Sequence, residues 1–410
     1  MAHPILTALW RNKTGPLLVA TQVALSLAIL ANALHIVQIR QAVAARPSGV
    51  AHEQQIFHVE VRRMAVGTHQ DELALMQRET ATLRAVAGVQ SAAGANQAPL
   101  NRMGSYGGLT TDRKQLVSLA NTTNYSVSDS VLQTWELKLV AGRDFVPADY
   151  VDVDTRTSND GPRVAIITQA LARKLFPNSD NVVGKVIYNG TGPTAREMQI
   201  VGVIERLQTP AAQIDERGEF STIIPVRWTG FPGGYYTVRA EPGQRDRVMK
   251  EAEAALRAAS PTPIIVRTKS MEEYRLARYR ADNAMAWMLV TVSVLLLLIT
   301  ASGIVGMASL WVTQRRKQIG VRRALGARRI DILRYFLAEN VMITSAGVVA
   351  GVLLALGLNQ LLVSQFEMAR LPPGYLVTGA ALFWALGVLA VYGPAWRAAS
   401  ISPAIATRSA

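Results

Sequence analysis

The chain has 410 residues and no cysteine, which excludes a disulfide bond, a thiol nucleophile and a zinc site with cysteine ligands. Half of its residues are hydrophobic and its mean hydropathy is +0.17, which is high for a soluble chain and indicates membrane segments. The net charge of +14 divides into +4 on residues 40–283 and +10 on the rest. A nucleic-acid-binding protein would carry its excess on one folded basic face, so we expect no nucleic-acid partner.

The first apolar segment spans residues 17–39 and follows a short N-terminal segment, residues 1–16, with Arg11 and Lys13. About 20 apolar residues suffice to cross a hydrocarbon core of ~30 Å. We interpret 17–39 as a retained membrane helix. The alternative is a cleaved signal peptide, because basic residues precede an apolar run. The run is longer than the apolar region of a typical signal peptide, which favours the retained helix.

Residues 40–269 are predicted to form a large domain of mixed α and β structure. Apolar and polar residues alternate over 57–62, which predicts a strand, and apolar residues at helical spacing predict a helix over 73–87, ended by Gly88. The other elements expected are strands at 164–167, 198–204, 221–226 and 264–267, and helices at 169–176 and 243–259.

This domain shows no catalytic constellation. None of the five histidines lies in a metal-binding spacing such as HExxH, and we interpret His52 and His58 as ordinary surface or strand residues. We therefore expect no enzyme activity, no metal site and no cofactor.

Three more apolar segments follow the large domain. The segment 270–313 is predicted to be a charged stalk helix that continues into a second membrane helix, and the third and fourth membrane helices are expected at 341–363 and 375–396. Each contains at least ~20 residues without a charged side chain, enough to cross a membrane. The predicted fold class is therefore a membrane α-helical protein with four transmembrane helices, one before and three after a large α+β extracytoplasmic domain.

The segment 314–340, between the second and third membrane helices, is strongly basic. Such loops lie in the cytoplasm, so we expect the N-terminal segment and the tail 397–410 to be cytoplasmic too and the large domain to lie outside. The segment contains two acidic residues, Asp331 and Glu339, and eight basic ones: Arg315, Arg316, Lys317, Arg322, Arg323, Arg328, Arg329 and Arg334.

Residues 315–327 read Arg-Arg-Lys-Gln-Ile-Gly-Val-Arg-Arg-Ala-Leu-Gly-Ala. This segment resembles the cytoplasmic signature of MacB/FtsX-type ABC permeases, in which a glutamate is usual where this chain has Gln318. Residues 330–340, 393–399 and 402–404 are also similar to the family. The large domain resembles its periplasmic core domain at residues 141–145, 164–176, 183–185 and 200–203. The resemblance covers nearly the whole chain.

The resemblance implies a permease subunit of the mechanotransmission type, which couples ATP hydrolysis by a separate cytoplasmic ABC ATPase to motion of the periplasmic domain, for export or efflux. It also implies a location in a bacterial inner membrane and a second permease, as a homodimer or heterodimer. It leaves room for a periplasmic adaptor or membrane-fusion protein. Two alternatives within the family are lipoprotein extraction and regulation of a periplasmic cell-wall hydrolase without transport. A further alternative, outside the family, is a membrane-anchored enzyme. The lack of a catalytic constellation argues against it. The size of the outer domain favours export.

The signature segment is our candidate for the contact with the ATPase. Gly320 and Gly326 allow a short helix, a turn and a second helix. From charge alone, docking to a partner and contact with anionic lipid are equally good interpretations, and the resemblance favours docking for 319–327 and lipid contact for Arg328 and Arg329. The candidate coupling residues are Ile319, Gly320, Arg322, Arg323, Ala324, Leu325, Gly326 and Ala327.

Two further sequence features bear on partners. Residues 1–410 contain no GxxxxGK[ST] phosphate-binding loop, so we expect ATP binding and hydrolysis to reside in a partner subunit. Gly347 and Gly351 form a GxxxG pattern in the third membrane helix, which permits close helix approach. Packing within the chain and dimerisation are equally good uses of this pattern.

Overall fold

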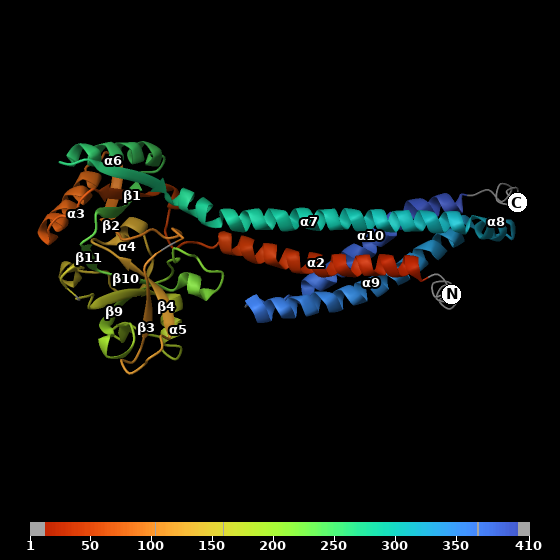
Figure 1. Ribbon diagram of the computed structural model, residues 1–410, viewed down its shortest axis with the longest axis horizontal. Helices are drawn as coiled ribbons and strands as arrows, with labels where there is room; N and C mark the ends of the chain where they lie inside the picture. Colours follow the sequence, from red (N-terminus) through yellow and green to blue (C-terminus); the bar gives the residue numbers. More distant parts are fainter. Residues whose placement is uncertain (1–12, 103, 159, 367–368, 401–410) are drawn as a thin grey trace. The chain divides into compact units, whose positions relative to one another are not determined.

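A computed structural model describes residues 13–102, 104–158, 160–366 and 369–400 of the chain (Figure 1). The chain divides into two compact units. The outer unit is Val43–Ala281, and the membrane unit combines Met1–Ala42 with Asp282–Ala410. Arg11, residues 402–404 and the rest of the tail after Ser400 lie outside the described residues.

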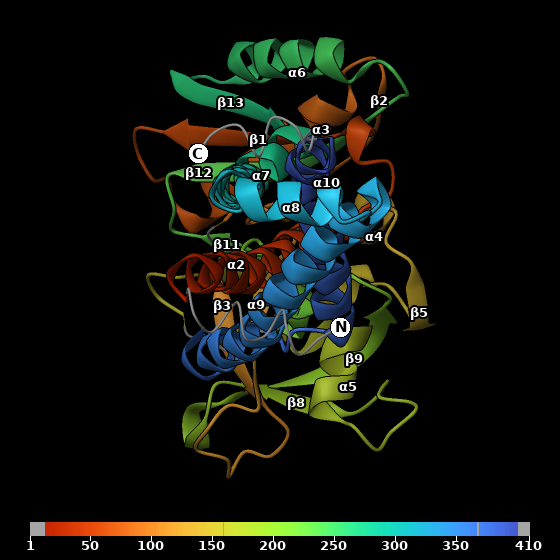
Figure 2. The ribbon, with the colours of Figure 1, turned by 90° about the vertical axis from the view of Figure 1, so that its right-hand side faces the viewer.

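The outer unit contains a four-stranded antiparallel sheet in the order β13-β1-β12-β2. The strand expected at 57–62 is β1 (Ile56–Arg63), and its neighbours are β2 (Val89–Gly94), β12 (Gly233–Ala240) and β13 (Ile264–Ser270). Helices α3 (His69–Arg84) and α6 (Arg245–Ala259) pack on this sheet, and Figures 1 and 2 show α6 lying along it. Their apolar faces enclose a core around Phe57, Leu83 and Val248.

A second, mixed sheet has seven strands in the order β5-β9-β7-β10-β4-β3-β8, and an additional pairing of β8 with β9 joins its two sides. Its core contains Ile167, Ile200 and Phe220. The strands are β3 (Tyr106–Thr110), β4 (Ala120–Ser126), β5 (Leu139–Gly142), β7 (Val164–Thr168), β8 (Val186–Asn189), β9 (Arg196–Ile204) and β10 (Ser221–Ile224).

The remaining elements of the outer unit are short. β6 (Val151–Asp154) and β11 (Val226–Thr229) form a two-stranded parallel sheet. The other helices are α4 (Val131–Trp135), α5 (Gln169–Leu175), and the 3₁₀ turns Glu53–Gln55, Pro147–Asp149, Gly192–Thr194 and Glu216–Glu219.

The two histidines singled out from the sequence have different environments. His52 is exposed, whereas His58 lies in β1 with 1% of its surface exposed, against the rings of Trp135, Tyr235 and Tyr274. Burial, with a smaller contribution from the charge of Lys269, lowers the pKa of His58 to about 3. His58 is therefore neutral at physiological pH and acts as part of the core.

The membrane unit contains four helices that are long and apolar enough to cross a membrane. With the outer α+β domain, they confirm the fold class predicted from the sequence. Each helix extends beyond the predicted apolar run, because flanking polar residues continue it. The four are α2 (Thr14–Ala44), α7 (Met271–Gln314), α9 (Arg329–Phe366) and α10 (Pro373–Ala399), and a short helix, α8 (Arg316–Ala324), follows α7.

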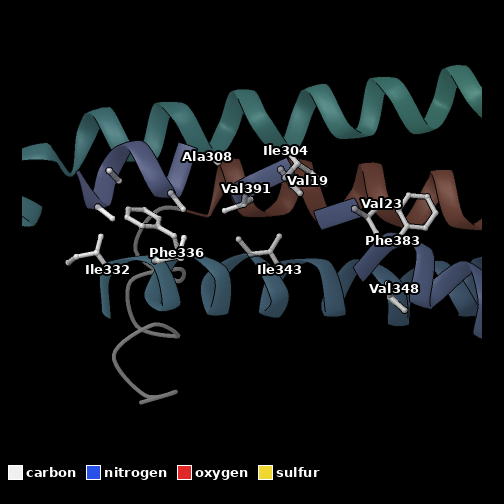
Figure 3. Close-up of a cluster of buried hydrophobic side chains, with 14 of the residues drawn as sticks. Val19, Val23, Ile304, Ala308, Ile332, Phe336, Ile343, Val348, Phe383 and Val391 are labelled. Atoms are coloured by element: carbon white, nitrogen blue, oxygen red, sulfur yellow. The ribbon is translucent and has the colours of Figure 1, made fainter. Parts of the chain in front are cut away.

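Helix α2 lies among the other membrane helices and contributes Val19, Val23 and Leu27 to the buried cluster shown in Figure 3. It also makes polar contacts, since the hydroxyls of Ser26 on α2 and Thr300 on α7 lie 2.9 Å apart. Its window of highest hydropathy is 56% buried, against 17–33% for the other three helices. This packing supports the interpretation of residues 17–39 as a membrane helix.

Glycines allow α9 and α10 to approach α2 closely. A Cβ atom at Gly347 would lie 2.7 Å from the carbonyl oxygen of Ala20, and one at Gly351 would lie 3.0 Å from that of Ala24. On α10, a Cβ at Gly379 would lie 2.5 Å from Leu27. The GxxxG pattern thus faces a helix of its own chain.

Candidate functional site

The basic signature segment folds as helix α8 and a tight turn. Ala327 N–H donates to the carbonyl of Arg322 at 3.0 Å, and Gly326 N–H donates to that of Arg323 at 3.2 Å. This pair of bonds is the Schellman arrangement that ends a helix, and it needs a residue with positive φ. Gly326 supplies it, with φ at +94°. The predicted turn therefore lies at Gly326, while Gly320 lies within α8.

One face of α8 is turned into the membrane unit. Ile319 is 4% exposed and belongs to the same buried cluster as Ile332 and Phe336 of α9 (Figure 3), and Gly320 is also buried. The sequence placed Ile319 among the contacts offered to a partner, but its side chain is enclosed by its own chain. Ile319 and Gly320 therefore anchor α8 to the membrane helices of the same chain. Their side of α8 is not exposed to a partner.

The opposite face of α8 and the turn after it are open. Leu325 is 83% exposed and Val321 is 52% exposed. Arg322 and Ala324 are exposed beside them, and Arg323 and Ala327 are half-buried. This region offers two apolar side chains with a basic border, the composition of a small docking surface.

Two arginines hold α8 against α9. Arg315, the residue before α8, donates to the Glu339 carboxylate at 2.7 Å, and Glu339 is 1% exposed. Seven residues later on α8, the guanidinium of Arg322 lies 5.2 Å from the ring centre of Tyr335. Breaking a buried charge pair by removing one partner is strongly destabilising. Part of the basic charge therefore has a structural role.

Glu339 and Tyr335 were not predicted as site residues. A signal for Glu339 was present, because it stands at the start of an apolar span, where a carboxylate needs a partner. Its partner, Arg315, is 24 residues away in sequence. The sequence alone does not show which of the eight basic residues of the segment pairs with Glu339. Arg328 and Arg329, the pair predicted to contact lipid, are exposed, and the Arg328 backbone N–H donates to the Asp331 carboxylate at 2.9 Å, at the start of α9.

Two family descriptions match the chain. The MacB-like periplasmic core domain matches residues 18–258, and the FtsX-like permease C-terminal region matches residues 290–403, which include the site just described. The first match covers more than half of the chain.

Curated relatives are similar over part of their length. The macrolide export ATP-binding/permease protein MacB of Agrobacterium fabrum is 30% identical over 251 residues, which cover 58% of this chain and 37% of the relative. The pyoverdine export ATP-binding/permease protein PvdT of Pseudomonas savastanoi pv. phaseolicola is 30% identical over 260 residues, which cover 60% and 38%. The chain thus spans less than two fifths of these relatives.

Among solved structures, the extracellular domain of the noncanonic ABC-type transporter YknZ from Gram-positive bacteria is similar over 52% of this chain and all of its own length. The sequence identity is 16% and the TM-score is 0.34.

Proposed function

Since the chain belongs to the MacB/FtsX-type family of ABC transporter permeases, we propose that it is a permease subunit that converts ATP hydrolysis by a separate cytoplasmic ATPase into motion of its outer domain, for export. The relatives are named as exporters of a macrolide and of pyoverdine, which favours export over lipoprotein extraction and over regulation of a cell-wall hydrolase. Residues 1–410 contain no GxxxxGK[ST] phosphate-binding loop, so the proposal assigns no ATP hydrolysis to these residues.

The observation that carries this proposal is the two-sided character of α8. Leu325 is exposed where a partner can contact it, while Ile319 and the Arg315–Glu339 pair fix α8 to the membrane helices. A force applied at Leu325 would therefore be transmitted to α7 and α9. Coupling of this kind needs an element that can adopt two positions, and α8 with its attached helices is the candidate.

The start of α7 supports a route to the outer domain. α7 runs without interruption from Met271 to Gln314, and its first turns, up to Ala281, belong to the outer unit. Arg275 donates to Glu53 at 2.9 Å, and Arg278 donates to the carbonyl of Ala211 at 2.6 Å. Motion of α7 would pull directly on these contacts.

The absence of cysteine allows a direct test of this motion. Arg173→Cys places one spin label on the exposed surface of α5 in each copy of the chain. The sample is a dimer of the labelled chain in nanodiscs together with the ATPase. We expect the distance between the two labels to change when ATP is held in the ATPase without hydrolysis. Label distances that stay the same while ATP is hydrolysed would contradict the mechanism.

We further propose that α8 lies in the cytoplasm and the outer unit on the opposite side of the membrane, because loops rich in arginine stay inside. A periplasm-active reporter fused at Gly49 or Asp160 is expected to work, and one fused at Gly326 is expected to fail. The reverse pattern, or activity at Gly326, would exclude this topology. Fusions at equal expression levels provide the comparison.

A further inference from the structure

A cleft of about 870 Å³ lies between the two larger sheets of the outer unit. Residues of β1 and β12 line one side, and residues of β4, β9, β10 and β11 line the other; Figure 1 labels all of these strands except β12, which Figure 2 labels. Sites that enclose small molecules usually have volumes of about 300–1,000 Å³. The cleft is therefore large enough for an organic ligand.

Part of the cleft is lined by aromatic and apolar side chains. Phe231 is 54% exposed, and Trp228 is half-buried with its indole N–H donating to the Ser126 hydroxyl at 2.9 Å, which fixes the ring. Val226 and Pro232 also line the cleft. An exposed phenyl ring beside a fixed indole provides a surface on which another ring or an alkyl chain can pack.

The charged side chains of the cleft are mostly basic. Four arginines and one glutamate line it. Among the described residues, no carboxylate pairs with Arg196, which stands exposed at the start of β9. Its guanidinium is therefore free to bind an anionic group with two parallel hydrogen bonds. The other three arginines each have a carboxylate partner: Arg62 with Glu60, Arg63 with Glu79 and Arg227 with Asp152.

Two side-chain amides add hydrogen-bonding capacity. Asn124 of β4 and Asn189 of β8 line the cleft, and within the described part of the chain their side-chain amides have no hydrogen-bond partner. Asn124 is 6% exposed, so its amide is buried at considerable cost unless a further group binds it. A Cβ at Gly107 would lie 2.7 Å from Asn124 Nδ2 and 2.7 Å from Asn189 Oδ1, so this glycine leaves room for both amides.

We propose that this cleft binds a small organic anion with an aromatic or other apolar body. Arg196 would hold the anionic group, while Trp228 and Phe231 would contact the apolar body. The amides of Asn124 and Asn189 would bind additional polar groups of the ligand. Binding in this cleft requires one chain and no ATPase, so a failure of the coupling mechanism would leave this proposal unaffected.

A pair of fluorescent probes tests the charge requirement. Anilinonaphthalene sulfonate and phenylnaphthylamine share their ring system, but only the first is an anion. With the full chain in lipid nanodiscs, and the signal of empty nanodiscs subtracted, we expect saturable binding of the sulfonate. Arg196→Gln should weaken the sulfonate roughly tenfold, because a charge-assisted hydrogen bond is lost, and should leave the uncharged probe unchanged.

Two further variants complete the test. Phe231→Ser should weaken both probes, and Arg173→Gln, an exposed arginine on α5 outside the cleft, should weaken neither. Arg196 and Phe231 are exposed, so both variants should fold, which their melting temperatures will check. Sulfonate binding that is unchanged by Arg196→Gln and Phe231→Ser would overturn the proposal. Equal loss of both probes on Arg196→Gln would overturn its charge requirement.

Discussion

Replacing Leu325 with aspartate is expected to abolish co-purification of the permease with the ABC ATPase that we propose as its partner. Leu325 is 83% exposed, so the substitution removes nothing from the core of the chain itself. If Leu325 is buried on docking, the aspartate would bring an unpaired charge into the contact, which typically costs several kcal/mol. The measurement is a pull-down from membranes that contain the permease and a co-expressed ABC ATPase at matched levels.

Two controls separate docking from other effects. Replacing Arg328 and Arg329 with glutamine should leave the ATPase bound if these residues contact only lipid. Ile319→Asp should lower the melting temperature of the permease itself, because Ile319 is 4% exposed, whereas Leu325→Asp should not. Full retention of the ATPase by Leu325→Asp would show that this surface faces lipid, and the coupling mechanism would then fail.

The membrane helices were predictable because their signal is local. A long run without charge has few alternatives to a membrane helix. The lengths of the helices were harder to predict from the sequence. Within 314–340 a short helix, a turn and a second helix were expected, and that second helix, α9, begins at Arg329 and continues into the membrane span, since Ile332, Phe336 and Ile343 recur at helical spacing and enter the core. A helix that extends past the membrane surface shows this periodicity without the high hydropathy that marks the span.

The outer domain shows the limits of local patterns more clearly. β4 reads Ala-Asn-Thr-Thr-Asn-Tyr-Ser, a polar sequence that predicts no buried strand, yet Thr122 and Thr123 are fully buried. The hydroxyl of Thr122 lies 2.9 Å from that of Thr222 on β10, 100 residues away. Hydrogen bonds of this kind make polar burial possible, and nothing near β4 in the sequence identifies the partner.

The cleft and the α8 contacts depend on distant pairs in the same way. The signature predicted a docking segment at 319–327, and the structure divides it into an anchored face at Ile319 and an open one at Leu325. That division follows from the packing of α8 on α9, which the local sequence does not contain. Arg196, in contrast, belongs to no motif, and only the fold brings it into the cleft with Trp228.

Replacing Gly347 with leucine is expected to separate α2 from α9 and to destabilise the membrane unit. A Cβ at Gly347 would lie 2.7 Å from the Ala20 carbonyl oxygen and 2.9 Å from the Val23 Cβ. The first of these atoms belongs to the α2 backbone, so the clash can be relieved only by moving the helix. Overpacking of this kind costs about 1–3 kcal/mol, and we expect the melting temperature of the purified chain to fall by several degrees.

Gly357 provides the matched control on the same helix, because no heavy atom lies within 4 Å of a Cβ built there. Gly357→Leu should therefore keep the melting temperature of the unsubstituted chain, while Gly351→Leu should resemble Gly347→Leu, since its Cβ would lie 3.0 Å from the Ala24 carbonyl oxygen. Chemical cross-linking of the same samples distinguishes the alternative use of the GxxxG pattern. A Gly347→Leu variant that melts normally but no longer forms dimers would assign the pattern to contact between chains, because packing against α2 would then have tolerated the larger side chain.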